Sequence, residues 1–444
     1  MQTFFTPAQM ADPHIQDVNQ ILRTCVHCGF CNSTCPTFVL LGDELDSPRG
    51  RIYLIKDMLE HDKPASAKVT KHIDRCLSCL SCVTTCPSGV DYMHLIDEAR
   101  VRIGKTYRRP FFERVLRSFM VRVLPNPALF RWSLIAAWMM RPLRFALPKR
   151  IKAMLSLTPR TLASPSPMDR PQEFQASGEK RKRVALLTGC AQQVLKPSIN
   201  EATIRILTRH GCDVVVADGV GCCGALVHHM GCEDEAREQA RANILAWEHL
   251  VENGDPNSEG DSNGDDQDGG VLDAIIVNAS GCGTMIKDYG ALFRDDYIFA
   301  ERAARIASFT RDISEFLVEL DLKTVVIDEP YAVTYHSACS LQHGQKITSQ
   351  PRALLEEAGF TVREPKEAHL CCGSAGTYNI LQPDIAARLR ARKADNLAAT
   401  KPDVVASGNI GCLMQLEGAL EAPVVHTVEL LDWATGGPKP LGLK

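Results

Sequence analysis

The sequence predicts an α+β multidomain protein in which an α-helical N-terminal domain precedes a duplicated α/β domain. Three observations indicate this fold. The first hundred residues contain a helical pattern of apolar residues, in 51–60, between two closely spaced groups of cysteines. From residue 184 onward, short β-rich runs alternate with helical stretches, which is typical of a mostly parallel sheet. A cysteine pattern that occurs twice in this second part indicates a duplication.

The N-terminal cysteines form two copies of one motif. Each copy reads Cys-x-x-Cys-x-x-Cys-x-x-x-Cys-Pro, and the copies begin at Cys25 and Cys76. Bacterial ferredoxins use this run to hold two [4Fe–4S] clusters, and the fourth cysteine of each run ligates the other cluster. We therefore predict a ferredoxin-like domain over 1–100. Its first cluster takes Cys25, Cys28, Cys31 and Cys86, and its second takes Cys76, Cys79, Cys82 and Cys35. Structural zinc is the disfavoured alternative, because it usually shows paired Cys-x-x-Cys knuckles.

Residues 101–183 are strongly basic, with 19 Lys and Arg against 4 Asp and Glu. Prolines interrupt the segment, and Ser164–Pro167 indicates a flexible linker. Its apolar stretch Trp132–Met140 is too short for a spanning helix, which needs ~20 residues. We predict a basic linker or docking segment that contacts an anionic lipid surface or a partner subunit. A solvated linker is the simpler alternative.

Several strands expected after residue 183 end just before a cysteine. Such thiols lie at the carboxyl ends of the strands, where open α/β sheets bind their ligands. The expected strands are Val184–Leu187, Asp213–Val216, Ala274–Val277, Lys323–Ile327, Ala332–Tyr335 and Val404–Ala406.

The repeated cysteine pattern contains a cysteine-cysteine-glycine (CCG) triplet. The triplets at Cys222 and Cys371 each follow a single cysteine by 32 residues. An acidic low-complexity loop over 254–270 explains the greater length of the first copy. We predict two CCG domains, 184–320 and 321–444, each with four thiols for a candidate further iron–sulfur cluster. The thiols are Cys190, Cys222, Cys223 and Cys282 in the first domain, and Cys339, Cys371, Cys372 and Cys412 in the second. The unrepeated Cys212 and Cys232 suit buried apolar positions.

Four histidines lie near these cysteines in the sequence: His228, His229, His336 and His343. They are candidate proton carriers or hydrogen-bond donors to metal ligands, and the alternative is a structural role. His336 is favoured because it precedes Cys339 by three residues. No Gly-x-Gly-x-x-Gly follows an expected strand, so neither flavin nor nicotinamide binding is predicted, and no catalytic residue is assigned.

Together with Ser47–Leu54 (SPRGRIYL) and Cys86–Val90 (CPSGV), these motifs resemble the iron–sulfur subunit of bacterial glycolate oxidase over nearly the whole chain. The resemblance implies an electron-transfer subunit that is not catalytic alone. Its FAD-containing partner subunits oxidise glycolate and D-lactate to the 2-oxo acid, and the electrons reach a membrane acceptor, a quinone or a cytochrome. It further implies a cytoplasmic protein, peripheral on the inner face of the cytoplasmic membrane through 101–183, with no nucleic-acid partner.

The CCG halves also resemble subunits of heterodisulfide reductase and anaerobic glycerol-3-phosphate dehydrogenase, and lactate-utilisation proteins. An electron-transfer or catalytic subunit of such a complex is therefore the alternative. In the cluster-binding relatives the last cysteine of each repeat opens a Cys-x-x-Cys, but Met285 and Gln415 stand at the second position here. A site with five thiolates is not expected, which leaves a four-thiolate site or an empty one. The same residues weigh against disulfide reduction by this chain, and the ferredoxin spacing disfavours a zinc-stabilised nucleic-acid binder.

Overall fold

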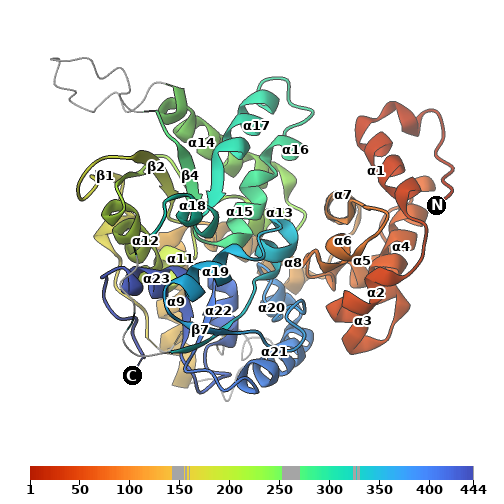
Figure 1. Cartoon of the computed structure of the whole chain (residues 1–444). Coiled ribbons are helices and arrows are strands. Elements are labelled where there is room, and N and C mark those ends of the chain that lie inside the picture. The colour runs from red at the N-terminus through yellow and green to blue at the C-terminus, as the bar shows by residue number, and fades with distance from the viewer. Residues whose placement is uncertain are drawn as a thin grey trace.

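The structure is a computed structural model that describes residues 1–142, 155, 158–159, 161–252, 271–323, 327 and 331–443. A helical N-terminal part, a helical hairpin and two α/β units follow one another along the chain. In Figure 1 the N-terminal part, in red, lies beside the α/β units, in green and blue. The predicted fold class, helical first and duplicated α/β second, is confirmed.

Residues 1–106, all of them described, form the N-terminal part and contain no strand. The helices are α1 (Pro13–Thr24), α2 (Phe30–Thr34), α3 (Pro36–Leu41), α4 (Pro48–Glu60), α5 (Ala67–Asp74), α6 (Ser81–Thr85) and α7 (Tyr92–Thr106), with short 3-10 turns at Gln9–Ala11 and Glu44–Asp46. The helix expected in 51–60 is confirmed as α4, where the Ser47 hydroxyl accepts a hydrogen bond from the Gly50 amide and caps the helix. Apolar residues of α1, α4, α5 and α7 form the core: Leu22, Ile55, Ile73, Leu95 and Ile96.

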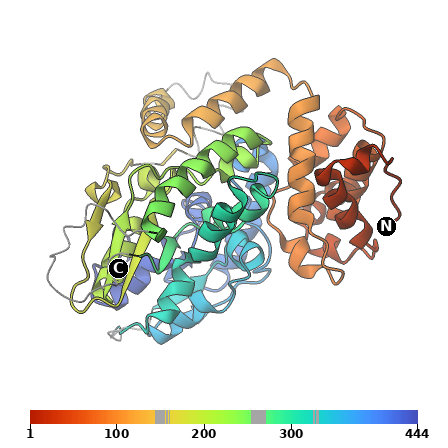
Figure 2. The same cartoon turned by 90° about the horizontal axis from the view of Figure 1, so that it is seen from above.

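Two further helices, α8 (Phe111–Val123) and α9 (Pro127–Met140), pack against each other and lead from the N-terminal part to the α/β units, as the orange segment in Figure 2 shows. Met120 of α8 is buried in the core of the first α/β unit. None of the residues of α9 is buried. Farther along, Gln172–Phe174 adds strand β1 to the first sheet, so part of the segment predicted as a linker is built into a domain.

The first α/β unit contains a five-stranded sheet in the order β1-β3-β2-β4-β5, in which β1 alone runs antiparallel to its neighbour. Besides β1, its strands are β2 (Lys182–Leu187), β3 (Cys212–Val216), β4 (Ala274–Val277) and β5 (Thr310–Asp312). Its helices are α11 (Gln192–Leu195), α12 (Ser198–Arg209), α13 (Ala225–His228), α14 (Glu233–Glu252), α15 (Ser280–Lys287), α16 (Tyr289–Leu292), α17 (Ala300–Phe309) and α18 (Ile313–Glu319).

The second α/β unit contains a four-stranded parallel sheet in the order β7-β6-β8-β9. The strands are β6 (Ala332–Tyr335), β7 (Thr361–Arg363), β8 (Val404–Ser407) and β9 (Val424–His426). A π-helical turn, η5 (Ser340–Gly344), and five helices accompany them: α19 (Gln350–Glu357), α20 (Tyr378–Leu381), α21 (Pro383–Ala398), α22 (Ile410–Leu416) and α23 (Thr427–Ala434). Without β1, the first sheet has the same order of strands along the chain, which confirms the duplication.

Five of the six expected strands are confirmed, as β2, β3, β4, β6 and β8. The sixth, Lys323–Ile327, falls largely outside the described residues, as does the acidic loop 254–270. The sheets lie on either side of residue 320, and the domain boundaries themselves stay predictions. Buried residues of both sheets, including Val184 and Val404, join in one continuous apolar core, so the two units pack together.

Candidate iron–sulfur and metal sites

Eight cysteines of the N-terminal part line two neighbouring cavities. The first cavity, of about 440 Å³ including space open to solvent, is lined by Cys25, Cys28, Cys31 and Cys86. The second cavity, of about 310 Å³, is lined by Cys35, Cys76, Cys79 and Cys82. Cys82 also borders the first cavity, so the two cavities are adjacent. The structure thus brings together the same two sets of thiols that the spacing predicts as ligand sets.

The loops that carry these cysteines follow the same curved backbone path twice. His27 and Gly29 have φ angles of 58° and 86°, and the corresponding Ser78 and Leu80 have 49° and 61°. A left-handed conformation costs a residue with a side chain about 1–2 kcal/mol. Such strain persists where the surroundings impose it, typically at a binding site. Leucine at this position gives no sequence signal, so sequence reasoning did not find this feature.

The donor chemistry of both cavities fits a [4Fe–4S] group. The eight cysteines that line the two cavities provide four thiols for each group, and none of them is in a disulfide. Burial raises the pKa of the Cys79 and Cys82 thiols well above the ordinary thiol value. Metal binding at these sulfurs must therefore displace protons, as it does at other cysteine sites.

A buried guanidinium lies beside the second cavity. The Arg51 side chain is 1% exposed and donates hydrogen bonds to the Thr37 hydroxyl at 3.0 Å and to Cys35 Sγ at 3.8 Å. The carboxylate of Asp46 lies 3.8 Å from Arg51 and also accepts a hydrogen bond from Arg75 at 2.6 Å. The positive charge of the Arg51 guanidinium stabilises thiolate ligands next to it. By contrast, Arg49 of the same helix forms an ion pair with Glu44 at the surface.

In the first CCG domain the four repeated cysteines meet at one edge of the sheet. Cys222 raises the pKa of the Cys190 thiol, and Cys222 and Cys282 raise the pKa of the Cys223 thiol, because these sulfurs are neighbours. Cys190 follows β2 and Cys282 lies in α15 just after β4, so these thiols occupy the carboxyl ends of parallel strands as predicted. Gly224 turns the chain after the pair with a φ of 91°.

The second CCG domain repeats this arrangement. Cys339 and Cys371 lie in one buried cluster, Cys372 follows Cys371 directly, and Cys372 Sγ donates a hydrogen bond to Cys412 Sγ at 3.6 Å. Each CCG domain therefore gathers its four repeated thiols, whereas Cys212 of β3 is fully buried in the apolar core, as predicted.

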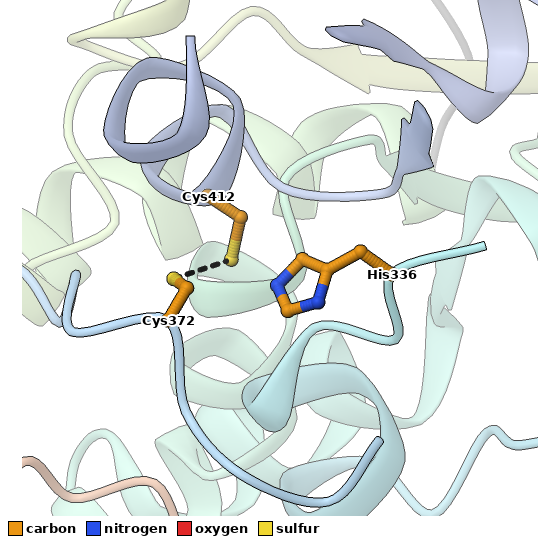
Figure 3. Close-up of side chains that lie close together, drawn as sticks. All are labelled: His336, Cys372 and Cys412. Atoms are coloured by element: carbon orange, nitrogen blue, oxygen red, sulfur yellow. Dashed lines mark hydrogen bonds between the residues drawn. The ribbon is translucent and has the colours of Figure 1, made fainter. Parts of the chain in front are cut away.

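Only the second domain adds a histidine to its thiols among the described residues. The side chain of His336 points toward Cys372 and Cys412 (Figure 3), and the ligand atoms of these three residues lie within 4.8 Å of one another. His336 is 1% exposed, and its burial lowers its pKa to about 3, so the ring is neutral.

The other three histidines lie at contacts between parts of the chain. His228 and His229 lie near Asp97 of α7, and His343 Nδ1 is 2.7 Å from the Thr84 hydroxyl of α6. A histidine near a cysteine in the sequence can thus lie beside the thiols or at a contact between parts of the chain. The spacing in the sequence does not distinguish these two positions.

The two positions where relatives have a further cysteine are part of the packing. Met285 is buried in the apolar core of the first α/β unit. The Gln415 amide donates hydrogen bonds to the backbone carbonyls of Cys372 and Ala386, both at 3.3 Å. Neither side chain supplies a fifth thiolate.

Comparisons with known proteins agree with this division of the chain. The 4Fe-4S dicluster domain family matches residues 21–90, and the cysteine-rich domain family matches 184–287 and 333–417. The glycolate oxidase iron–sulfur subunit of Escherichia coli strain K12 is 39% identical over 434 residues, covering 98% of this chain and 99% of that protein. The chain belongs to the glycolate oxidase iron–sulfur subunit family. Within this family, the probable subunit of Bacillus subtilis strain 168 is 33% identical and covers 94% of each chain.

Other matches have a lower sequence identity. Lactate utilization protein A 1 of Bacillus cereus strain AH820 is 26% identical over 257 residues, which are 56% of this chain and 98% of that protein. The crystal structure of a hypothetical protein from Helicobacter pylori matches with a TM-score of 0.52 and 8% identity, covering 98% of this chain and 74% of that one, and it bears on the fold alone.

Family membership makes this chain an iron–sulfur electron-transfer subunit of an oxidoreductase complex, as the sequence predicts. No helix among the described residues combines the length and apolar character needed to cross a membrane.

Proposed function

We propose that this chain transfers electrons from FAD-containing subunits, which oxidise glycolate and D-lactate to the 2-oxo acid, to a quinone or cytochrome in the membrane. The chain itself is not catalytic in this proposal. The eight N-terminal cysteines hold two [4Fe–4S] clusters in the predicted sets, and each CCG domain is a candidate for a further metal group.

One observation carries the proposal: the eight cysteines line two adjacent cavities in two groups of four, and Cys82 of the second group also lines the first cavity. When bound, [4Fe–4S] clusters supply one-electron chemistry, which divides the two-electron oxidation of a hydroxy acid into single steps. The cysteines fix both positions on one rigid helical scaffold. Arg51 adds a buried positive charge at the second position.

The surface beside the first cavity supports docking of a flavin subunit there. Cys28 is exposed, and around it Val26, Phe30 and Tyr53 expose 67%, 63% and 55% of their surface. Adjacent apolar side chains at the surface are typical of a protein interface. A partner on this face would come close to the first cavity and exclude water from it.

The α8–α9 hairpin supports contact with the inner face of the cytoplasmic membrane. Its exposed apolar residues, Phe111, Phe112, Trp132, Trp138 and Met139, accompany the exposed Arg114 and Arg122. Aromatic and cationic side chains together favour the interface of an anionic bilayer.

A lactate-oxidising complex is the second candidate, because the lactate utilization protein of Bacillus cereus matches more than half of this chain. The substrate given to the reconstituted complex distinguishes the two candidates.

The test uses purified flavin subunits and this chain, singly and together, in dye-linked oxidation of glycolate and D-lactate. We expect turnover only when both are present. A Phe30→Glu variant should lose stimulation while keeping its iron, and Leu129→Glu, at an exposed apolar residue of α9, is the matched control. Turnover by this chain alone would refute the electron-transfer role, and stimulation by lactate but not glycolate would select the second candidate.

A further inference from the structure

The two CCG domains differ at one position that faces their cysteines. Leu187 and His336 each precede the first cysteine of their set by three residues. Leu187 is the last residue of β2, and His336 directly follows the equivalent strand β6. Leu187 is 2% exposed and packs in an apolar core. His336 is equally buried, but it places two polar nitrogen atoms where the first domain has an apolar side chain.

Neither nitrogen of His336 has a hydrogen-bond partner among the described residues. A buried polar group without a partner costs about 1–3 kcal/mol, so native proteins rarely leave one unmatched. The ring is directed at the thiols of Cys372 and Cys412 (Figure 3), and a neutral imidazole and two thiolates are all good ligands for transition metals.

The distances among these groups suit one metal ion. The Sγ atoms of Cys372 and Cys412 are 3.6 Å apart, and the ligand atom of His336 lies within 4.8 Å of both. Two thiolates bound to a tetrahedral Zn²⁺ with Zn–S bonds of about 2.3 Å would be about 3.8 Å apart. Cys371 and Cys339, the other two thiols of the set, are both buried and offer the fourth ligand.

We propose that the second CCG domain binds a single tetrahedral Zn²⁺ through His336, Cys372, Cys412 and one further thiol of its set. The first CCG domain, with Leu187 in place of the histidine, does not share this mixed nitrogen and sulfur site. This inference is independent of the proposed electron transfer, because Zn²⁺ has no redox chemistry.

The site differs from a cluster site in the number of metal atoms that its ligands share. Ligands of a cubane bond different iron atoms and are held apart by it, whereas the ligand atoms of the three groups here lie within 4.8 Å of one another. His336, Cys372 and Cys412 are at most 3% exposed, which suits a closed structural zinc site.

The test measures metal content and coordination of the full-length protein purified without oxygen. We expect about one zinc per chain besides the iron, and zinc-edge X-ray absorption with about one nitrogen and three sulfur neighbours. His336→Leu, which copies the residue of the first domain, should lower zinc at least tenfold with iron unchanged. His336→Cys should keep zinc with a sulfur-only shell.

His249→Leu, on the exposed side of α14, is the control and should keep both metals. If His336→Leu does not fold, the change of shell in His336→Cys still decides the question. Zinc retained by His336→Leu, iron in place of zinc at this site, or a wild-type zinc shell without nitrogen would overturn the proposal.

Discussion

The two CCG domains share their strand order and cysteine pattern, but they contact the N-terminal part in different ways. In the second domain, Cys339 and Cys371 pack against Leu77 and Cys79 of the loop that lines the second cavity. In the first domain, the cysteines lie away from this contact, and α13 and the residues after α15 meet α1 and α7 instead. After duplication, one copy adjoins a cluster cavity and the other braces the N-terminal part.

This difference assigns a different task to each domain. The second domain extends the cysteine-rich region from the second cavity into the α/β part of the chain. The first domain supports the α8–α9 hairpin through Met120 and holds α7 by polar contacts such as that of His94 with Asp288. Four substitution experiments test the comparison.

The largest effect is expected from the cysteines of the N-terminal cavities. Cys28→Ser and Cys79→Ser should each lose about four of the eight cluster irons, because a cubane left with three thiolates is readily destroyed by oxidation. Turnover with flavin subunits should fall about 100-fold or more in both. Iron and sulfide analysis with EPR measures the loss.

The comparison of the two CCG domains makes a sharper prediction for the Cys28 and Cys79 variants. Only Cys79→Ser should also alter metal binding in the second CCG domain, since Cys79 contacts that domain, whereas Cys28 is exposed and lines the first cavity. Cys232→Ser, outside every predicted set, is the control. Full iron content in either variant would contradict the ligand assignment.

Much of this arrangement follows from local sequence. The spacing of cysteines after Cys25 and Cys76 predicts which thiols share a cavity, because short loops around a cluster are encoded by neighbouring residues. The repeated 32-residue interval predicts the two CCG domains for the same reason. Contacts between distant segments leave no such pattern: the hydrogen bond of Thr84 with His343 joins residues 259 positions apart.

Other features escape sequence reasoning because they depend on tertiary packing. Strands β5, β7 and β9 have three residues each, too few for an alternating pattern. Leu80 in a left-handed conformation and Arg51 as a buried ion both contradict ordinary residue preferences, so only the folded surroundings explain them. Both lie at the second cavity.

The glycines after the CCG pairs distinguish the domains by backbone crowding. Gly224 and Gly373 both have a φ of 91°, but an added Cβ would lie 3.0 Å from the Ala236 carbonyl oxygen in the first domain and 2.6 Å from the Ala386 oxygen in the second. Alanine costs about 1–2 kcal/mol at either position from backbone strain. Gly373→Ala should destabilise by about 1 kcal/mol more, because backbone must move.

Denaturant unfolding of the two variants measures this difference. Gly418→Ala, where φ is 77° and no atom lies near the added Cβ, is a control for backbone strain alone. Equal destabilisation by Gly224→Ala and Gly373→Ala would contradict the prediction. It would show that the close contact between the added Cβ at residue 373 and the Ala386 oxygen costs no stability.

The brace between the first domain and α7 should depend on pH. Hydrogen bonds to Asp288 and then to Asp91 raise the pKa of His94 to about 10. Because the folded pKa lies above the unfolded value of about 6.5, this stability is fully present below pH 6.5 and is lost as the pH rises through 10. We expect a loss of roughly 1–3 kcal/mol between pH 7 and pH 10, after allowance for partial exposure.

Thermal unfolding at a series of pH values measures the effect. Asp288→Asn should flatten the alkaline loss, and Asp295→Asn, which removes a neighbouring partner of His14, should leave it in place. An unchanged alkaline slope in Asp288→Asn would contradict this account of the brace.

The smallest effect concerns the hairpin that the first domain supports. Arg108, Arg114 and Arg122 are exposed, whereas Arg109 and Arg117 pair with Asp74 and Glu113. Only part of the basic segment is therefore available to a surface, since two of its arginines hold α8 against α5.

Each exposed arginine near an anionic bilayer contributes about 1 kcal/mol to binding. Reversing the charge of one arginine therefore lowers vesicle affinity only several-fold. Arg114→Glu and Arg122→Glu should each weaken sedimentation with anionic vesicles, and high salt should abolish the difference because it screens these charges. Arg352→Glu, on the exposed side of α19 in the second domain, is the matched control and should bind like the wild type. If the Arg352 variant weakens binding as much as the hairpin variants do, the membrane contact is not confined to the hairpin. If none of the three does, the exposed apolar residues of α9 face a protein subunit, and the first domain braces the complex without touching lipid.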